Sequence, residues 1–290
     1  MDHDLAVFEA RRPSLLALAY RMLGDLGRAE DIVQDAWLRW ERRDVAVAAP
    51  HAYLVKTVTR LCLNDLDSAR ARREEARSDR LPEPVDLERT GFDRIDVLDR
   101  VSMAFLLLLQ RLTPGERAAL LLHDVFEFDH AEIAGLLEKS EAACRQLLKR
   151  AREHVATERR AVAVPDDVHR RLLRAFLAAA ASGDVDAVAT LLADDVVLIV
   201  DAGPTGGSFG RVRNLPGPLV GAPKVAAFVA AVTPQGAEGL ETRECELNGQ
   251  PAVLVLRDGQ PRAAILLSVS DERISGVFMH ADPARLGHVA

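Results

Sequence analysis

Apolar residues recur with a helical period near the middle of the chain. Over residues 141–154 they fall three and four positions apart, which places them on one face of an amphipathic helix. The apolar stripe comprises Cys144, Leu147, Leu148, Ala151 and Val155. The remaining surface of this helix is basic and polar and comprises Arg145, Gln146, Lys149, Arg150 and Arg152. The pattern predicts a helix that packs on one side and presents cations on the other.

Two shorter helices are predicted before it. The first opens at Thr113-Pro114-Gly115-Glu116, with Thr as the N-cap, Pro at the first helical position and Glu three residues after the cap, and runs to Phe126. The second spans residues 129–137 and ends in a tight turn at Lys139. This order is typical of a helix-turn-helix, whose last helix enters the major groove. Arg and Gln suit guanine and adenine edges, and Lys and Arg hold phosphates, although a solvated helix in an ordinary bundle can also be basic.

Residues 5–75 predict about four helices. One apolar helix stops near Gly24, and the next runs from Arg28 to about Arg42. The outward face of the latter is acidic and contains a glutamine; it includes Asp31, Gln34 and Asp35. Such a face is either solvated surface or a docking face for a basic protein helix.

A long helix follows, from His51 to about Arg73, after a weakly polar loop at residues 44–50. It carries a continuous polar stripe that consists of Tyr53, Lys56, Thr57, Arg60 and Asn64. Aromatic, basic and amide groups together suit stacking against unpaired bases and hydrogen bonding to them. A solvent-exposed helix face without a binding function shows the same pattern, so a base-binding surface and an ordinary solvated surface are both possible at this point.

The pattern changes after Pro165. Helices are predicted first, then strands, with Asn248-Gly249 and Asp258-Gly259 as hairpin turn signals between successive strands. The predicted helices span residues 169–181, 185–192 and 222–232, and the predicted strands span residues 196–200, 240–247, 252–257, 263–270 and 273–280. Helices followed by a meander of antiparallel strands predict an α+β cone with a curved sheet. The chain is therefore expected to be multidomain, with two all-α domains at residues 1–77 and 96–160, a linker at 78–95 and an α+β domain at 165–290.

Composition and charge change the picture of DNA binding. The 290 residues suffice for two or three domains, and 49% of them are hydrophobic. A net charge of −7 is unusual for a free-standing DNA-binding protein, and residues 1–160 hold 26 basic and 29 acidic side chains. The positive charge is therefore local. A DNA-binding protein with almost no net positive charge is expected to need a partner protein that contributes part of the DNA-binding free energy.

Little in the chain predicts covalent or metal chemistry. Cys62, Cys144 and Cys245 form no CxxC pair and lie in apolar patterns, so they are expected to be core thiols in a reducing cytoplasm. No stretch of 18 uninterrupted apolar residues is present, so no membrane segment is expected. No cofactor or metal site is predicted. The candidates for catalysis lie near predicted strand ends and are not spaced as a catalytic set; they are Asp201, Arg211 and His280.

Three motifs in one order resemble the bacterial extracytoplasmic-function sigma factors. They are the segments 29–37, 52–54 and 140–152, and the resemblance covers residues 5–158. It implies two domains similar to sigma regions 2 and 4, which bind core RNA polymerase through its β′ clamp helices and β flap and also bind promoter DNA. It further implies that Asp31, Gln34 and Asp35 dock on the clamp helices. The polar stripe and the loop before it would capture flipped −10 bases, and the basic helix would read the −35 element.

The linker adds a second resemblance. Leu81-Pro82-Glu83-Pro84-Val85 favours an extended segment and is similar to the linker motif of the SigJ-like group, which carries an extra C-terminal domain. That group has an Asp-Gly-Gly-Gly-Lys motif where residues 201–207 here read Asp-Ala-Gly-Pro-Thr-Gly-Gly, without the lysine. Residues 281–286 read Ala-Asp-Pro-Ala-Arg-Leu and match the group's Asn-Pro-Asp-Lys-Leu pattern better than residues 201–207 match the glycine-rich motif, although the order of the polar residues is changed.

This resemblance implies a SnoaL-like (NTF2-like) C-terminal domain that modulates the sigma domains in cis and commonly encloses a pocket, here for an unknown small ligand. The residues implied in regulatory contacts are Leu81, Pro82, Glu83, Pro84, Val85, Asp201, Asp282 and Pro283.

Two other functions fit parts of the chain. One is a polymerase-independent helix-turn-helix regulator with a ligand-sensing domain, against which the acidic balance argues. The other is a SnoaL-like enzyme that the helical half targets, which the lack of a strong catalytic cluster disfavours. The leading expectation is a sigma factor rather than an enzyme.

Overall fold

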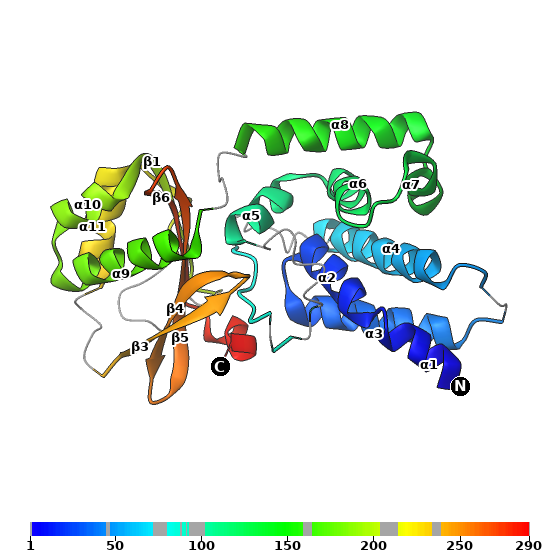
Figure 1. Ribbon diagram of the computed structural model, residues 1–290, viewed down its shortest axis with the longest axis horizontal. Coiled ribbons are helices and arrows are strands. Elements are labelled where there is room, and N and C mark those ends of the chain that lie inside the picture. The colour runs from blue at the N-terminus through cyan, green and yellow to red at the C-terminus, as the bar shows by residue number, and fades with distance from the viewer. Residues whose placement is uncertain are drawn as a thin grey trace. The chain divides into compact units, whose positions relative to one another are not determined.

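The computed structural model describes residues 2–44, 47–71, 80–87, 89–90, 92, 102–158, 164–203, 214–233 and 239–289. The chain forms two compact units (Figure 1). The first contains residues 1–77, 91–99 and 105–158, and the second contains residues 78–90, 100–104 and 159–290. The linker residues 80–87 therefore belong to the same unit as the C-terminal part of the chain.

The first unit begins with the helices predicted for residues 5–75. They are α1 (Asp2–Glu9), α2 (Arg12–Leu23), α3 (Leu26–Glu41) and α4 (Pro50–Ala71). Gly24 ends α2 with a φ of 69°, which a residue without Cβ adopts at no steric cost. The Asp25 side chain then caps α3 by accepting the backbone N–H of Arg28 at 3.0 Å. Helix α3 buries Ile32 and Val33, as its periodicity predicts.

The helix-turn-helix lies in the second part of this unit. Its helices are α6 (Pro114–Asp124), α7 (His130–Leu137) and α8 (Glu141–Glu158), and α5 (Met103–Arg111) precedes them. The capping box of Thr113 and Glu116 is confirmed. A second capping box joins Asp129 and Glu132, so Asp129 is the N-cap of α7 rather than its first helical residue. The apolar stripe of α8 is buried as predicted, except that Leu147 is only half-buried.

A buried arginine joins the two helical parts of the first unit. Arg117 of α6 is 6% exposed, and its guanidinium donates to the backbone carbonyls of Met22, at the end of α2, and Leu112. Carbonyl acceptors satisfy a buried guanidinium that would otherwise be costly.

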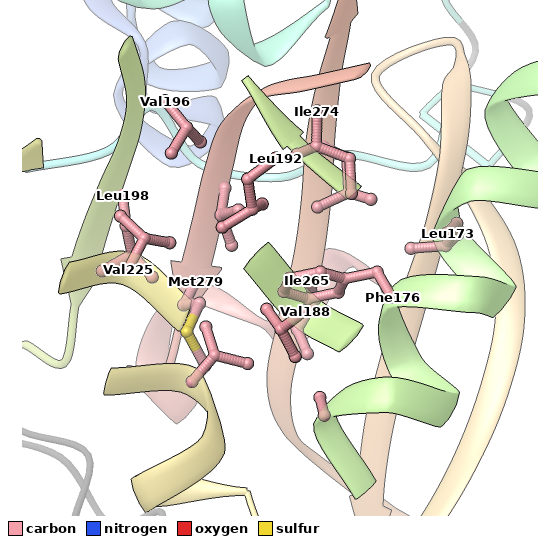
Figure 2. Packing of buried hydrophobic residues seen from close by; sticks show 14 of the residues in the cluster. Leu173, Phe176, Val188, Leu192, Val196, Leu198, Val225, Ile265, Ile274 and Met279 are labelled. Carbon is pink, nitrogen blue, oxygen red and sulfur yellow. The ribbon is translucent and has the colours of Figure 1, made fainter. Parts of the chain in front are cut away.

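The second unit contains three helices and one six-stranded sheet. The helices are α9 (Asp166–Ser182), α10 (Val185–Leu191) and α11 (Ala222–Val232). The strands are β1 (Leu192–Asp201), β2 (Leu219–Val220), β3 (Glu241–Leu247), β4 (Gln250–Arg257), β5 (Gln260–Ser270) and β6 (Arg273–His280). The three helices lie on one face of the curved sheet (Figure 1). Figure 2 shows Phe176, Val188 and Ile265 together in the core between these layers.

The sheet order is β2-β1-β6-β5-β4-β3. Strands β3 to β6 form the predicted antiparallel meander, with Asn248-Gly249 and Asp258-Gly259 at positive φ in the turns. Strand β1, for which the sequence pattern predicted no partner, pairs in parallel with β6 and antiparallel with β2. Parallel pairing needs a long crossover, and here α11 and four strands lie between β1 and β6 in the sequence. The sheet is therefore mixed.

The sheet face opposite the helices is also buried. Side chains alternate along a strand, and Leu254, Leu266 and Phe278 lie at positions between those of the helix-facing cluster. Each of them is at most 4% exposed. After β6 the chain continues in two 3-10 turns, η3 (Pro283–Arg285) and η4 (Gly287–Val289).

In the part of the chain that the structure describes, every helix is too short or too polar to span a bilayer.

Candidate functional sites

A hollow of about 340 Å³ lies beside α4 in the first unit. It is lined by Arg39, Tyr53, Lys56, Thr57 and Arg60. Four of the five residues of the predicted polar stripe therefore meet in one site, while Asn64 is exposed outside this lining. Arg39 was not predicted as a site residue; its exposed position on α3 was the available signal, but no local pattern links it to α4.

The ring of Tyr53 has a firm support. It packs against Trp40 with ring centroids 5.7 Å apart. Trp40 is 1% exposed, and its indole N–H donates to the Asp4 carbonyl at 3.1 Å. An aromatic ring held in this way provides a platform for stacking. Thr57 differs from its neighbours, because it is 9% exposed and its hydroxyl donates to the Tyr53 carbonyl at 2.8 Å.

Lys56 and Arg60 of α4 are bound to α7 in this structure. Lys56 Nζ donates to the Gly135 carbonyl at 3.0 Å, and Arg60 pairs with Glu138, the C-cap of α7. The C-terminal end of a helix carries partial negative charge, so cations are favoured there. Both side chains of the Arg60–Glu138 pair remain exposed, and exposed pairs contribute only about 0–1 kcal/mol. A competing anion can therefore displace these contacts at little cost.

The outward face of α8 is exposed as predicted. Arg145, Gln146, Lys149 and Arg150 are all exposed there. A hollow of about 390 Å³ is lined by His130, Arg145, Leu148, Lys149, Arg152 and Glu153. Two cations have ion pairs within the helix: Arg145 with Glu141 at 3.2 Å and Lys149 with Glu153 at 3.8 Å. Both pairs are exposed, so the cations are available to an incoming polyanion.

Arg152 is engaged inside the helix-turn-helix. Its guanidinium binds the carboxylate of Asp124 at the end of α6 and lies 3.1 Å from His123 Nδ1. Burial raises the pKa of Asp124, but the hydrogen bonds from Arg152 and His123 outweigh it and the net pKa is lowered. This geometry suits positioning of α8 on α6 more than base reading.

The acidic face predicted on α3 is exposed. Asp31, Gln34 and Asp35 point away from the buried residues Ile32 and Val33. The arrangement leaves two carboxylates and an amide available to a partner.

The linker is buried in the second unit. All five residues from Leu81 to Val85 are buried, and Leu81 and Val85 are 0% exposed. The Leu81 carbonyl accepts a hydrogen bond from Arg285 Nη1 at 2.6 Å. The carboxylate of Glu83 lies 3.7 Å from His288 Nε2. A linker with polar partners and no exposure is a structural part of this unit rather than a free spacer.

One ion pair anchors this region. Arg285 Nη1 is 2.9 Å from Asp201 Oδ2, and the two side chains are 12% and 3% exposed. The other Asp201 oxygen accepts the Gly203 N–H at 3.1 Å. Asp282 pairs with Arg80 at 3.3 Å, whereas Pro283 is exposed at the start of η3.

Gly203 occupies a position that admits no side chain. Its φ is +74°, and a Cβ built there would lie 2.6 Å from the Asp282 carboxyl group. Gly203 is the third residue of the segment aligned above with the Asp-Gly-Gly-Gly-Lys motif; residues 204–207 of that segment lie outside the described residues.

The candidates for catalysis do not form an open site. Asp201 and His280 are neighbours across β1 and β6, but both are buried, and Arg211 lies outside the described residues. Burial, together with the nearby charge of Arg285, lowers the pKa of His280 to about 3, so its imidazole is neutral at physiological pH. Burial also raises the pKa of the Cys62 and Cys144 thiols, which are buried as predicted, and raises that of half-buried Cys245 to about 11. None of these thiols is activated.

Two segments match known protein families. Residues 7–72 match the family described as Sigma-70 region 2, and residues 102–155 match the family described as Sigma-70, region 4. These segments contain the α3–α4 hollow and the helix-turn-helix.

Relatives cover nearly the whole chain. The chain is 37% identical to the ECF RNA polymerase sigma factor SigJ of Mycobacterium tuberculosis, over 97% of this chain and 92% of that one. It is 32% identical to the probable ECF RNA polymerase sigma factor SigI of the same species, over 98% and 96% of the two chains. The crystal structure of M. tuberculosis SigJ superposes with a TM-score of 0.73 at 30% identity and covers 98% of each chain. The chain therefore belongs to the extracytoplasmic-function sigma factors of the sigma-70 family, which direct transcription initiation by RNA polymerase, and it is SigJ-like, with a C-terminal α+β domain.

Proposed function

We propose that this sigma factor, which is not an enzyme, captures unpaired −10 bases in the hollow beside α4. The observation that carries the proposal is the grouping of a supported tyrosine ring with three cations, Arg39, Lys56 and Arg60, around one volume of about 340 Å³. Stacking on an aromatic ring offsets the few kcal/mol that base flipping costs. The cations suit the phosphates on either side of a flipped base. Thr57 lines the hollow, and Asn64 extends the surface along α4.

The exposed face of α8 is proposed to read the −35 element. Arg145, Gln146, Lys149 and Arg150 combine the groups that bind base edges with those that bind phosphates. The pairing of Arg152 with Asp124 supports a role in holding α8 in place. The acidic face of α3, with Asp31, Gln34 and Asp35, is proposed to dock on the β′ clamp helices, and the second helical domain on the β flap.

The C-terminal domain is proposed to modulate these activities in cis through the linker. Its support is the burial of Leu81, Pro82, Glu83, Pro84 and Val85 within the second unit and their contacts with residues near Asp201 and Asp282. A ligand for this domain remains a prediction from the resemblance alone.

The test is transcription by M. tuberculosis core RNA polymerase reconstituted with this protein. A promoter is first selected from random DNA by sequencing the transcripts. The double variant Tyr53→Ala, Lys56→Ala is expected to lose at least about tenfold in open-complex formation, because a stacked base is worth about 1–3 kcal/mol. Arg145→Ala with Lys149→Ala is expected to weaken closed-complex binding by about tenfold or more.

Each surface has a distinct signature. The α4 variant should lose less activity on a template already unpaired at −10 than on duplex, and the α8 variant should lose activity on both. Both variants should still bind core polymerase, and Asp31→Lys with Asp35→Lys should not. Equal losses on duplex and pre-melted templates for the α4 variant would contradict base capture at this hollow.

A further inference from the structure

The turn between β3 and β4 is buried, which is unusual for a polar hairpin turn. Asn248 and Gly249 take positive φ values of 53° and 67°, as a two-residue hairpin requires. Yet Asn248 is 0% exposed and Gln250 is 4% exposed. The equivalent turn between β4 and β5, at Asp258-Gly259, is exposed. Buried side-chain amides need partners, so the partners indicate what the turn does.

Asn248 holds the end of the linker motif. Its backbone N–H donates to the Val85 carbonyl at 2.8 Å, and its side-chain Oδ1 accepts the Val85 N–H at 3.2 Å. Both backbone groups of Val85 are therefore bound by one residue.

Gln250 holds a second, distant point of the chain. Its Oε1 accepts the backbone N–H of Met103, the first residue of α5, at 3.3 Å. Its Nε2 donates to the Leu267 carbonyl of β5 at 3.0 Å, which fixes the amide on the sheet. Met103 is 0% exposed. Residues 85 and 103 are thus held by side chains two positions apart.

We propose that Asn248 and Gln250 form a two-point clamp that shortens the tether between the −10-binding and −35-binding domains and so limits the promoter spacings that the factor accepts. This inference rests on the proposed function of those two domains. Thirty-one residues, 72–102, connect α4 to α5, and fully extended they reach roughly 100 Å. Residues 81–85 are buried in the second unit, so while both anchors hold only residues 72–80 can extend, to roughly 30 Å. With the clamp closed, the reach of the tether is therefore about a third of its full extended length.

Promoter spacing is sensitive to such a limit. Each added base pair lengthens the duplex by about 3.4 Å and rotates one element by about 34° relative to the other. When the tether is short, the second domain has a high effective concentration at its DNA element only if the spacing matches the tether, and this concentration falls steeply at longer spacings. When the tether is long, the effective concentration depends only weakly on the spacing between the two elements. Clamp residues are thus specificity-determining residues that touch no DNA.

The experiment measures transcription by the reconstituted holoenzyme on templates whose −10/−35 spacing varies in single base pairs about the optimum. The variant combines Asn248→Gly, which keeps the left-handed turn, with Gln250→Ala. The wild type is expected to lose about tenfold at two base pairs from the optimum, and the variant only about twofold to threefold. The matched control is Asp258→Gly, the same kind of change in the exposed turn, which should reproduce the wild-type profile. Superimposable profiles for the wild type and the clamp variant would overturn the proposal.

A second arm does not depend on the stability of the clamp variant. Six Gly/Ser residues inserted after Phe92 lie between the two anchors. In the wild type this insertion should leave the spacing profile unchanged, and in the clamp variant it should broaden the profile further. Broadening in the wild type would show that the anchors do not hold during initiation. A wild-type holoenzyme that yields no promoter-specific transcript would instead contradict the proposed function and not the clamp.

Discussion

The ion pair between Arg285 and Asp201 is expected to stabilise the end of β1 strongly. In Arg285→Met the Asp201 carboxylate stays buried without its cation, a change that costs about 3–5 kcal/mol in buried pairs. Asp201 keeps the N–H of Gly203, so the lower end, about 3 kcal/mol, is expected. This loss falls on the C-terminal domain, because both residues belong to the second unit.

Hydrogen exchange at the Ala281 amide measures this effect locally. That N–H donates to the Asp201 carbonyl at 2.7 Å, immediately beside the ion pair. A local readout is preferable to a melting curve, since a chain of two units need not unfold in one step. A loss of about 3 kcal/mol corresponds to exchange roughly 100-fold faster at equilibrium.

Two variants isolate the cause. Arg174→Met removes an exposed pair in the same domain, in which Arg174 binds Glu244 at 2.7 and 2.8 Å, and it should change exchange little. Asp201→Asn combined with Arg285→Met removes the uncompensated charge and should restore most of the protection. Wild-type protection in Arg285→Met, or no recovery in the double variant, would refute the reasoning.

Three further outcomes are expected. The pKa of His280 is lowered to about 3 by burial and by Arg285, so between about pH 6.5 and 3 the unfolded chain binds more protons than the folded chain. The stability of the C-terminal domain should therefore decrease as the pH is lowered from about 6.5 to 3, and His280→Gln should flatten this dependence in melting curves. Glu138→Gln should strengthen binding of a single-stranded −10 oligonucleotide by the free protein up to about fivefold by releasing Arg60, and unchanged anisotropy titrations would contradict that competition. Gly203→Ala should cost about 1–3 kcal/mol through its positive φ and the clash with Asp282, and a melting temperature equal to that of the wild type would exclude such strain.

Local patterns predicted most of the helices and the meander. The helix at Ala222–Val232 and the strand at Arg273–His280 have the bounds that periodicity and turn residues predict. Helix α5 was missed because its first seven residues, Met103–Leu109, are uniformly apolar and show no polar face. Strand β2 has two residues, too few for an alternation to show.

The candidate sites were predicted only as far as they lie on one helix. The stripe on α4 follows from spacing along that helix, but the addition of Arg39 and the bonds to Gly135 and Glu138 depend on tertiary packing. The same holds for the parallel pairing of β1. Periodicity reports which face of an element is buried, not which distant element covers it.

Release of Lys56 and Arg60 from α7 and release of the linker differ in free-energy cost, and this difference bears on regulation. Lys56 and Arg60 are held by exposed contacts, which a phosphate backbone can replace one for one. Val85 and Met103 are held by buried amides, and freeing either leaves a buried donor or acceptor without its partner. Promoter DNA is therefore expected to open the proposed −10 surface without disturbing the linker. A signal that acts through the C-terminal domain must supply the larger free energy at the β3–β4 turn, which makes that turn the point where such control is best sought.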